Sequence, residues 1–312
     1  MSLSALIAIG GNSLIQAGQR GTIDEQYQNA RATANSIVKM IASGWNVIIT
    51  HGNGPQVGAA LLRSERASTE VYTHPLDMCV ATTQGEIGYI IQRAMQFELQ
   101  AAGLIRQVVT LPTMVRVNAD DRAFKNPSKP IGPFYEKKVA EQRKRQLGWD
   151  IIEDAARGYR RVVASPEPVE VLELELIKTI SEMGIITIAL GGGGIPVISD
   201  GKFFKGCEAV IDKDRSSALL ASSAKVDLFV ICTEVDQVYL NYKKNNQKGL
   251  TVATIDELEQ YAADGQFPAG SMGPKIESVI KFIGNGGKKA IITSFDKLME
   301  ALSGSAGTLI EL

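Results

Sequence analysis

Short apolar runs alternate along the chain with stretches in which apolar residues recur at helical spacing. Residues 5–9 are all apolar and are followed by Gly10 and Gly11, which is typical of a buried strand that ends at a turn. Residues 45–50 form a second run of this kind. Between the two runs, apolar side chains recur every three or four positions, at Ala30, Ala34, Ile37, Val38 and Ile41. This strand–helix–strand unit predicts a parallel sheet with right-handed crossover connections.

The same alternation continues along the rest of the sequence. Further strands are expected at residues 185–190, 227–232 and 289–293. Beyond the first helix, within residues 24–44, helices are expected at residues 77–102, 168–183, 216–225 and 275–283. The chain is therefore predicted to be an α/β protein, and its 312 residues suffice for one large domain or two lobes.

One charged segment interrupts this alternation. Between residues 120 and 161, 18 of 42 residues are charged, and prolines fall at Pro127, Pro130 and Pro133. Such a composition excludes a core strand, and the segment is too long for a bare loop. We expect a solvated insertion, either a flap or a small subdomain.

Four predicted strands are followed by glycine-rich or polar turns. These turns are Gly10-Gly11-Asn12-Ser13, His51-Gly52-Asn53-Gly54-Pro55, Gly191-Gly192-Gly193-Gly194-Ile195-Pro196 and Thr233-Glu234-Val235-Asp236. Ligands of open parallel sheets bind outside the carboxyl ends of the strands, and glycine lets backbone N–H groups approach an anion there. Any one turn could serve only the connection. The four together predict a crevice that binds phosphate or carboxylate.

The common nucleotide-binding motifs are absent from the sequence. It contains no GxxxxGK[ST], no GxGxxG and no protein-kinase set of glycine loop, HRD and DFG. If the chain handles phosphate, it does so by another arrangement.

Three lysines stand in unusual surroundings. Lys275 ends a glycine-containing loop that leads into a predicted helix, where a cation opposes the helix dipole unless an anion is also bound. Lys213 lies between Asp212 and Asp214, and Lys129 lies between prolines of the charged segment. Each alone could be a solvated surface lysine. Together they supply the cations that phosphoryl transfer needs, and Asp214 could orient Lys213 or help to hold Mg²⁺.

Composition narrows the class of protein further. With 33 Lys+Arg against 34 Asp+Glu and a net charge of -1, nucleic-acid binding is not expected. No apolar stretch approaches the roughly 18 residues that span a bilayer, and no signal peptide is visible. Three widely spaced cysteines without a CxxC pair favour a cytoplasmic location. The only histidines are His51 and His74, so a histidine metal cluster is not expected, and His51 either takes part in chemistry or bonds its own turn.

Seven motifs in order resemble those of the carbamate kinases, a family of the amino-acid kinase superfamily. The motifs lie at residues 9–13, 50–58, 83–89, 126–134, 191–196, 208–214 and 270–275. The resemblance covers essentially the whole chain. It implies a three-layer α/β/α sandwich on a mainly parallel open sheet of about eight strands, with a small protruding flap subdomain, and a homodimer.

The resemblance also implies how the lobes divide the substrates. Residues 1–200 would bind carbamate or carbamoyl phosphate, with a mobile flap at about 118–165 that closes over this site. Residues 201–312 would bind ATP or ADP with Mg²⁺.

Individual site residues follow from the matching positions. Gly10, Gly11, Asn12, Gly52 and Asn53 would line the site of carbamate and the transferred phosphoryl group, where Asn12 neutralises developing charge. Lys129 would reach in from the flap, and Lys213 and Lys275 would bridge the phosphates. Asp214 would orient a lysine or the metal, and Tyr239, Met272 and Gly273 would contact the nucleotide.

The implied reaction is phosphoryl transfer between ATP and carbamate, used physiologically to make ATP from carbamoyl phosphate in arginine, agmatine or purine breakdown. Glu234 departs from the aspartate usual in the family. Ala8 stands where acetylglutamate kinases carry a lysine, which favours the carbamate branch. Two alternatives remain: another acyl-phosphate-forming kinase, acting on acetylglutamate or aspartate, and a non-catalytic sensor of nucleotide or carbamoyl phosphate.

Overall fold

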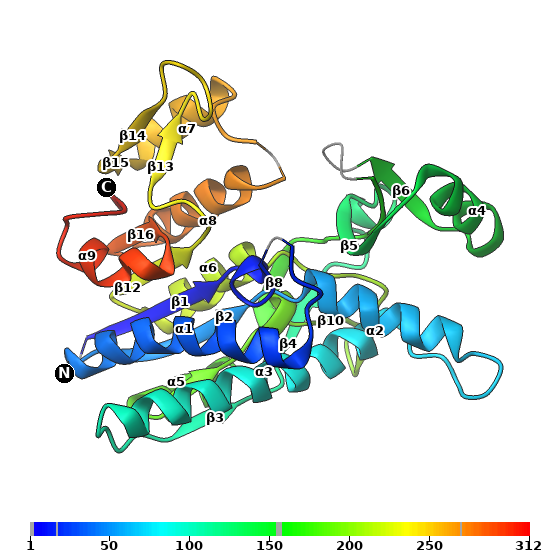
Figure 1. Cartoon of the computed structure of the whole chain (residues 1–312), viewed down its shortest axis with the longest axis horizontal. Helices are drawn as coiled ribbons and strands as arrows, with labels where there is room; N and C mark the ends of the chain where they lie inside the picture. Colours follow the sequence, from blue (N-terminus) through cyan, green and yellow to red (C-terminus); the bar gives the residue numbers. More distant parts are fainter. Residues whose placement is uncertain (1–2, 17, 154–157, 269) are drawn as a thin grey trace.

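A sheet of eight strands forms the centre of the molecule (Figure 1). The computed structural model describes residues 3–16, 18–153, 158–268 and 270–312. The strand order is β15 (Val252–Thr254), β17 (Thr308–Glu311), β16 (Lys289–Thr293), β12 (Leu228–Cys232), β1 (Ser4–Ile9), β2 (Asn46–His51), β9 (Ile186–Ile188) and β3 (Val108–Thr110). β16 and β17 pair antiparallel, and the other neighbours pair parallel. The sheet is thus mainly parallel, as predicted.

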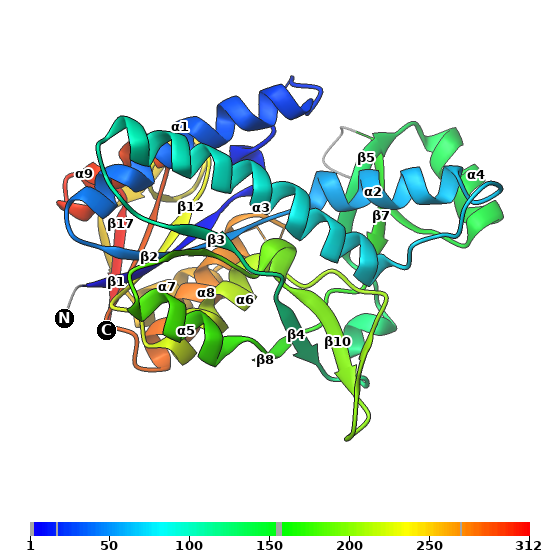
Figure 2. The same ribbon diagram turned by 90° about the horizontal axis from the view of Figure 1, so that it is seen from below.

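Helices cover both faces of this sheet (Figure 2). Alternate residues of β1 point to opposite faces of the sheet. Ile7 and Ile9 pack into one hydrophobic core, and Leu6 packs into the other. The first core is closed by α1 (Ile23–Ala42), α3 (Leu76–Ala101) and α9 (Leu298–Leu302), and the second by α5 (Leu174–Glu182), α6 (Lys213–Ala224), α7 (Ile255–Ala263) and α8 (Met272–Gly284). Because strands buried on both faces must be apolar throughout, the continuous runs of the sequence fit this position. The predicted three-layer sandwich is confirmed.

Among the described residues, no helix has the length and apolar character needed to cross a membrane.

Two smaller sheets flank the main one. The first has the strand order β11 (Phe204–Gly206), β10 (Ile195–Ser199), β4 (Met114–Val117) and β8 (Pro168–Val171), and the second pairs β13 (Val238–Leu240) with β14 (Lys248–Leu250). The prediction of a helix over residues 168–183 was therefore wrong in its first part. β8 is an edge strand that starts at Pro168 and contains Val169 and Val171, and proline is tolerated at the start of an edge strand. The helix, α5, begins only at Leu174.

The charged insertion folds as a small protruding subdomain, which we call the flap (Figure 1). It consists of β5 (Lys129–Tyr135), α4 (Lys137–Leu147), β6 (Asp150–Glu153) and β7 (Tyr159–Val163), with the three strands in the order β5-β7-β6. Trp149 is its buried anchor, and its ring lies beneath the guanidinium groups of Arg143 and Arg161. Charged side chains thus stack on the buried Trp149 ring, and Ile131, Ala140 and Val162 are buried as well, which explains how so polar a segment folds.

The flap rests on α2 (Gly54–Arg66), a helix that was not predicted from the sequence. A Cβ atom on Gly58 of α2 would lie 2.0 Å from Cα of Gly132 in β5. Gly132 itself has φ +71°, which favours glycine. These two glycines let the backbones of α2 and the flap touch directly. A second contact is the ion pair between Arg161 of β7 and Glu65 of α2, at 2.6 Å.

Candidate active site

The glycine turns meet at the carboxyl edge of the main sheet. A Cβ atom on Gly52, after β2, would lie 3.3 Å from the backbone nitrogen of Gly11, after β1. A Cβ atom on Gly192, in the short 3₁₀ turn after β9, would lie 2.1 Å from Nδ2 of Asn53. At Gly10 it would lie 3.2 Å from the carbonyl oxygen of Cys232, the last residue of β12. A side chain at Gly192 would clash, and at Gly52 and Gly10 it would be tightly packed, so that the turns approach one another through backbone groups.

Two helices begin beside this surface and bring two lysines onto one carboxylate. Lys213 is the first residue of α6, and its Nζ donates to Oδ1 of Asp214 at 2.5 Å. Lys275 lies on the first turn of α8, and its Nζ donates to Oδ2 of the same carboxylate at 2.9 Å. The three side chains are only 10%, 14% and 5% exposed for Lys213, Lys275 and Asp214. Buried cations at two converging helix N-termini favour an anion strongly.

Burial and charge set the ionisation of this cluster in opposite directions. Burial alone would raise the pKa of Asp214, but the charges of Lys213 and Lys275 outweigh it and hold that pKa well below its usual range. Burial lowers the pKa of Lys213, and the neighbouring charge of Lys275 adds to this, although Asp214 opposes it. Burial would likewise lower the pKa of Lys275, but Asp214 outweighs it and raises that pKa. Asp214 is therefore an ionised carboxylate that orients two lysines.

The flap adds the third lysine. Lys129, the first residue of β5, forms an ion pair with Asp212. Asp212 is also the N-cap of α6, because its Oδ1 accepts from the backbone N–H of Asp214 at 2.9 Å. Three lysines and two aspartates leave one net positive charge in the cluster. At an effective dielectric of 20, each lysine about 4 Å from a phosphoryl oxygen would interact by on the order of 4 kcal/mol before desolvation.

His51 is part of the packing at this site. Its Nδ1 lies 3.0 Å from the carbonyl oxygen of Gly52, so that Nδ1 carries the proton and donates to the turn. Burial, with a smaller contribution from the charge of Lys213, lowers its pKa to about 4, although the hydrogen bond to Gly52 opposes both. A Cβ atom on Gly191 would lie 2.6 Å from the imidazole ring. His51 is thus a neutral side chain that forms a hydrogen bond within its own turn and packs against Gly191 in the turn after β9.

The structure places the remaining predicted site residues as follows. Asn53 is the N-cap of α2, where its Nδ2 donates to Oγ1 of Thr83 at 2.9 Å. Met272 and Gly273 begin α8 and are separated from Lys275 by Pro274. Tyr239 lies on the separate β13–β14 hairpin and donates to Oδ1 of Asp236 at 2.7 Å. Contact of these residues with nucleotide stays a prediction. The side chain of Asn12 lies outside the described part of the structure.

Two residues of the site were not predicted from the sequence. Asp212 is the first, and an aspartate directly before a helix is a recognisable N-cap signal. Ser216 donates from Oγ to the carbonyl oxygen of Gly193 at 2.7 Å and ties α6 to the glycine turn after β9. No local pattern distinguishes this serine from its neighbour Ser217.

Asp214 suits lysine orientation better than metal binding. Both of its carboxylate oxygens accept from ammonium groups, so a divalent cation there would face two positive charges. In the part of the chain that the structure describes, no group of three or more His, Cys, Asp or Glu side chains is placed to hold a metal ion. These side chains are therefore better suited to bind an anion that carries its own metal ion than to hold a metal ion directly.

A mainly parallel sheet with glycine turns beside a buried Lys–Asp–Lys cluster defines an α/β protein with a cationic site that contains no P-loop. The amino acid kinase family model matches residues 5–294. The chain is 47% identical to the carbamate kinase of Thermococcus kodakarensis and 46% identical to that of Staphylococcus haemolyticus, in each case over 309 residues and 98% of both chains. The structure of carbamate kinase from Giardia lamblia bound to AMP-PNP matches it with a TM-score of 0.92 and 39% identity, over 99% of this chain and 98% of that one. The chain therefore belongs to the amino acid kinase family, and the resemblance inferred from the seven motifs is confirmed.

Proposed function

We propose that the chain is a carbamate kinase, which transfers a phosphoryl group reversibly between carbamoyl phosphate and ADP. The observation that carries the proposal is the buried Lys213–Asp214–Lys275 cluster beside the glycine turns, in a chain whose full-length relatives are carbamate kinases. Phosphoryl transfer is catalysed mainly by positioning and by cations around the transferred group. The cluster provides such cations in a place where water is largely excluded.

The proposed reaction is direct and in line. An oxygen of the ADP β-phosphate forms the new P–O bond, while the P–O bond to the carbamoyl group breaks and carbamate leaves with the electron pair. Lys213 and Lys275 would neutralise charge on the phosphates, and Lys129 would act from the flap. The backbone N–H groups of the turns at Gly10, Gly11 and Gly52, with Asn12 and Asn53, would hold the carbamate side.

The division of substrates follows the same proposal. Residues 1–200, including the flap at about 118–165, would hold carbamate or carbamoyl phosphate, and residues 201–312 would hold ATP or ADP. Mg²⁺ would enter with the nucleotide, bound chiefly by phosphate oxygens, and would neutralise part of their charge. This agrees with the full occupancy of the Asp214 oxygens by lysines.

The assay of ATP formation tests the proposal. ADP, Mg²⁺ and one of three phosphoryl donors are supplied: carbamoyl phosphate, acetyl phosphate or acetylglutamyl phosphate. We expect rapid ATP formation from carbamoyl phosphate alone, and its loss when EDTA removes Mg²⁺. ATP formed fastest from acetylglutamyl phosphate would instead identify another acyl-phosphate kinase, and bound ADP without turnover of any donor would indicate a sensor. Synthesis of ATP in arginine, agmatine or purine breakdown, and a cytoplasmic location, stay predictions.

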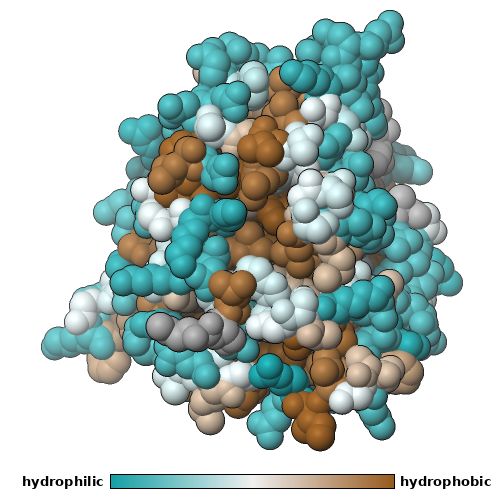
Figure 3. All heavy atoms as spheres, turned by 90° about the vertical axis from the view of Figure 1, so that its left-hand side faces the viewer, coloured by the Kyte–Doolittle hydropathy of each residue, from teal (hydrophilic) through white to brown (hydrophobic). Residues whose placement is uncertain are grey.

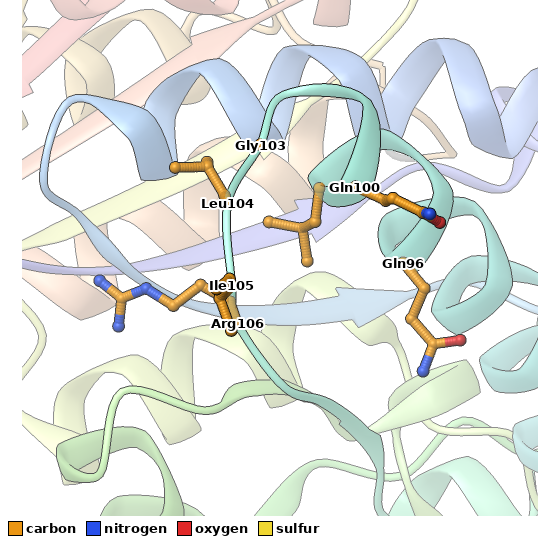
Figure 4. Close-up of a pocket in the computed structure, with 7 residues that line it drawn as sticks. Gln96, Gln100, Gly103, Leu104, Ile105 and Arg106 are labelled. Atoms are coloured by element: carbon orange, nitrogen blue, oxygen red, sulfur yellow. The ribbon is translucent and has the colours of Figure 1, made fainter.

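We also propose a homodimer that includes the β3 edge of the main sheet. Figure 3 shows apolar side chains gathered on the end of the molecule that holds the amino ends of the parallel strands. Exposed apolar residues precede strands at this end, and one of them, Ile105, is 100% exposed. It borders an open pocket of about 370 Å³ formed with Gln96 and Gln100 of α3 and with Arg106 (Figure 4). An edge strand beside exposed apolar surface is a typical site for association.

Sedimentation velocity measures the oligomeric state. We expect a species of twice the 33.6 kDa chain mass, and we expect Ile105→Asp to shift the population toward monomer. Val252→Asp changes another exposed apolar residue, at the opposite edge of the sheet, and should leave the mass unchanged. A wild-type monomer at all concentrations would refute the dimer, and an Ile105→Asp dimer would refute the β3 edge.

A further inference from the structure

The flap is connected to the rest of the molecule at its two long strands. The backbones of Gly132 and Gly58 touch, and Arg161 pairs with Glu65, so β5 and β7 both rest on α2. Ile131 and Val163 of these strands also belong to an apolar cluster with Val57 and Val210. A further connection is ionic and does not involve α2. Lys129, at the start of β5, pairs with Asp212 at the start of α6.

The two oxygens of the Asp212 carboxylate therefore have different roles. One oxygen, Oδ1, accepts from the backbone N–H groups of Asp214 at 2.9 Å and Arg215 at 3.4 Å, which fixes the first turn of α6. The other, Oδ2, accepts from the ammonium group of Lys129. The first turn of α6 carries Lys213, whose Cδ lies 3.5 Å from a Cβ placed on Gly52. The flap is thus attached to the same helical turn that places a buried lysine against the glycine turns.

The charges around Asp212 agree with a fixed ion pair. Burial raises the pKa of Asp212, and the charge of Asp214 adds to this, but the charge and hydrogen bond of Lys129 together with the charge of Lys213 outweigh both and lower the pKa. The side chains are 29% exposed for Lys129 and 15% exposed for Asp212, so the pair is only partly screened by water. Asp212 accepts one of the three N–H bonds of the Lys129 ammonium group. The remaining donors can turn toward an anion at the mouth of the cluster.

We propose that Asp212 is a positioning residue, which holds Lys129 and with it the flap against the N-terminus of α6. This inference rests on the proposed function, because it takes Lys129 to act on the phosphoryl group. Asp212 contacts neither phosphate nor carbamate and acts through Lys129. Its loss therefore lowers the fraction of molecules in which Lys129 is in place for carbamoyl phosphate, while the Lys213–Asp214–Lys275 cluster stays intact.

Asp212→Asn separates the two roles of this residue. Asparagine caps helices about as well as aspartate, so α6 keeps its first turn, but the charge that holds Lys129 is removed. We expect kcat/KM for carbamoyl phosphate to fall roughly 10- to 100-fold, the size of effect that follows misplacement of a catalytic group. The KM for ADP should change less than about twofold. Lys129→Met should lower kcat/KM at least as much, and Asp212→Asn should add little in the double variant, because its effect passes through Lys129.

Hydrogen exchange provides a second readout that does not require turnover. Backbone amides of residues 129–135 and 159–163 should exchange faster in Asp212→Asn, and equally in Lys129→Met. Asp227→Asn is the matched control. Asp227 also pairs with a lysine, Lys288 at 2.5 Å, and accepts from the backbone N–H of Ser4, but it lies at the amino end of the sheet. This variant should change neither the flap exchange nor the activity.

Three outcomes distinguish the inference from the proposed function. Wild-type chain without ATP formation would refute the proposed function, and the exchange measurement would still test the attachment of the flap. Active wild-type chain in which the losses from Asp212→Asn and Lys129→Met multiply would show that Asp212 acts on the rate independently of Lys129, and would overturn the proposal. Unchanged exchange in the flap of Asp212→Asn would likewise overturn the proposal.

Discussion

Lys213→Met is expected to leave the chain folded and to lower the rate of ATP formation by about 10²–10³-fold, the usual loss when one fixed donor to developing charge is removed. The fold should persist because Asp214 keeps its second partner, Lys275, at 2.9 Å. Methionine matches the length of the lysine stem and fills the same buried space. The lost cation cannot be replaced by water, because the side chain is only 10% exposed.

The measurement is steady-state ATP formation from carbamoyl phosphate, with circular dichroism and a thermal melt as checks of folding. Lys225→Met serves as the control, because Lys225 is an exposed lysine at the other end of the same helix. It should retain nearly full activity. A Lys213→Met variant with wild-type rates would remove Lys213 from the mechanism.

Asp214→Asn is expected to abolish activity and also to destabilise the protein. Asparagine leaves two buried ammonium groups without their shared carboxylate. Removal of one partner from a buried ion pair typically costs about 3–5 kcal/mol, which is a large part of the stability of most domains. Asp214 thus differs from Lys213, since its loss affects the free energy of unfolding as well as catalysis. Urea unfolding at pH 7 measures the difference.

The pH dependence of stability gives the same prediction a second test. The pKa of Asp214 is lowered in the folded chain, because the charges of Lys213 and Lys275 outweigh its burial. An aspartate with a lowered folded pKa contributes stability above its unfolded pKa, about 3.9, and loses this contribution as the pH falls toward the folded value. Wild-type chain should therefore lose stability steeply below about pH 4, and Asp214→Asn should show a shallower slope there.

Asp264→Asn is the control for both measurements. Asp264 is exposed at the end of α7, where it accepts from Gln260 at 3.1 Å. Surface substitutions of this kind usually change stability by no more than about 0.5 kcal/mol. If Asp214→Asn were as stable as this control, Asp214 would not be what stabilises the charged forms of Lys213 and Lys275.

The order of strands and helices was largely predictable, because it depends on local patterns. The apolar run at residues 5–9 and the helical spacing between residues 24 and 44 correspond to β1 and α1. The error at residues 168–171 has the same origin. Val169 and Val171 suit a strand and Pro168 suits the first position of an edge strand, but only pairing with β4 decided between strand and helix.

The site was predictable as a set of residues but not as an arrangement. The sequence identifies Gly52 and Gly192 as members of glycine turns after strands. The close approach of Gly192 to Asn53, however, depends on the pairing of β9 with β2. Lys129, Lys213 and Lys275 stood out by their surroundings in the sequence. That Asp214 joins two of these lysines and Asp212 holds the third was not evident, because short motifs do not show which distant side chains meet.

The sequence by itself determined the α/β class, the turns at the carboxyl ends of the strands and the charged insertion, since each depends on neighbours within a few residues. Only the tertiary structure decided which charges share a site. Lys275 and Asp214 are 61 residues apart, and Lys129 and Asp212 are 83 apart. Their ion pairs form only where α6 and α8 begin side by side at one edge of the sheet and the first residue of β5 reaches the start of α6. Burial then strengthens these pairs, because water screens them less than it screens pairs on the surface.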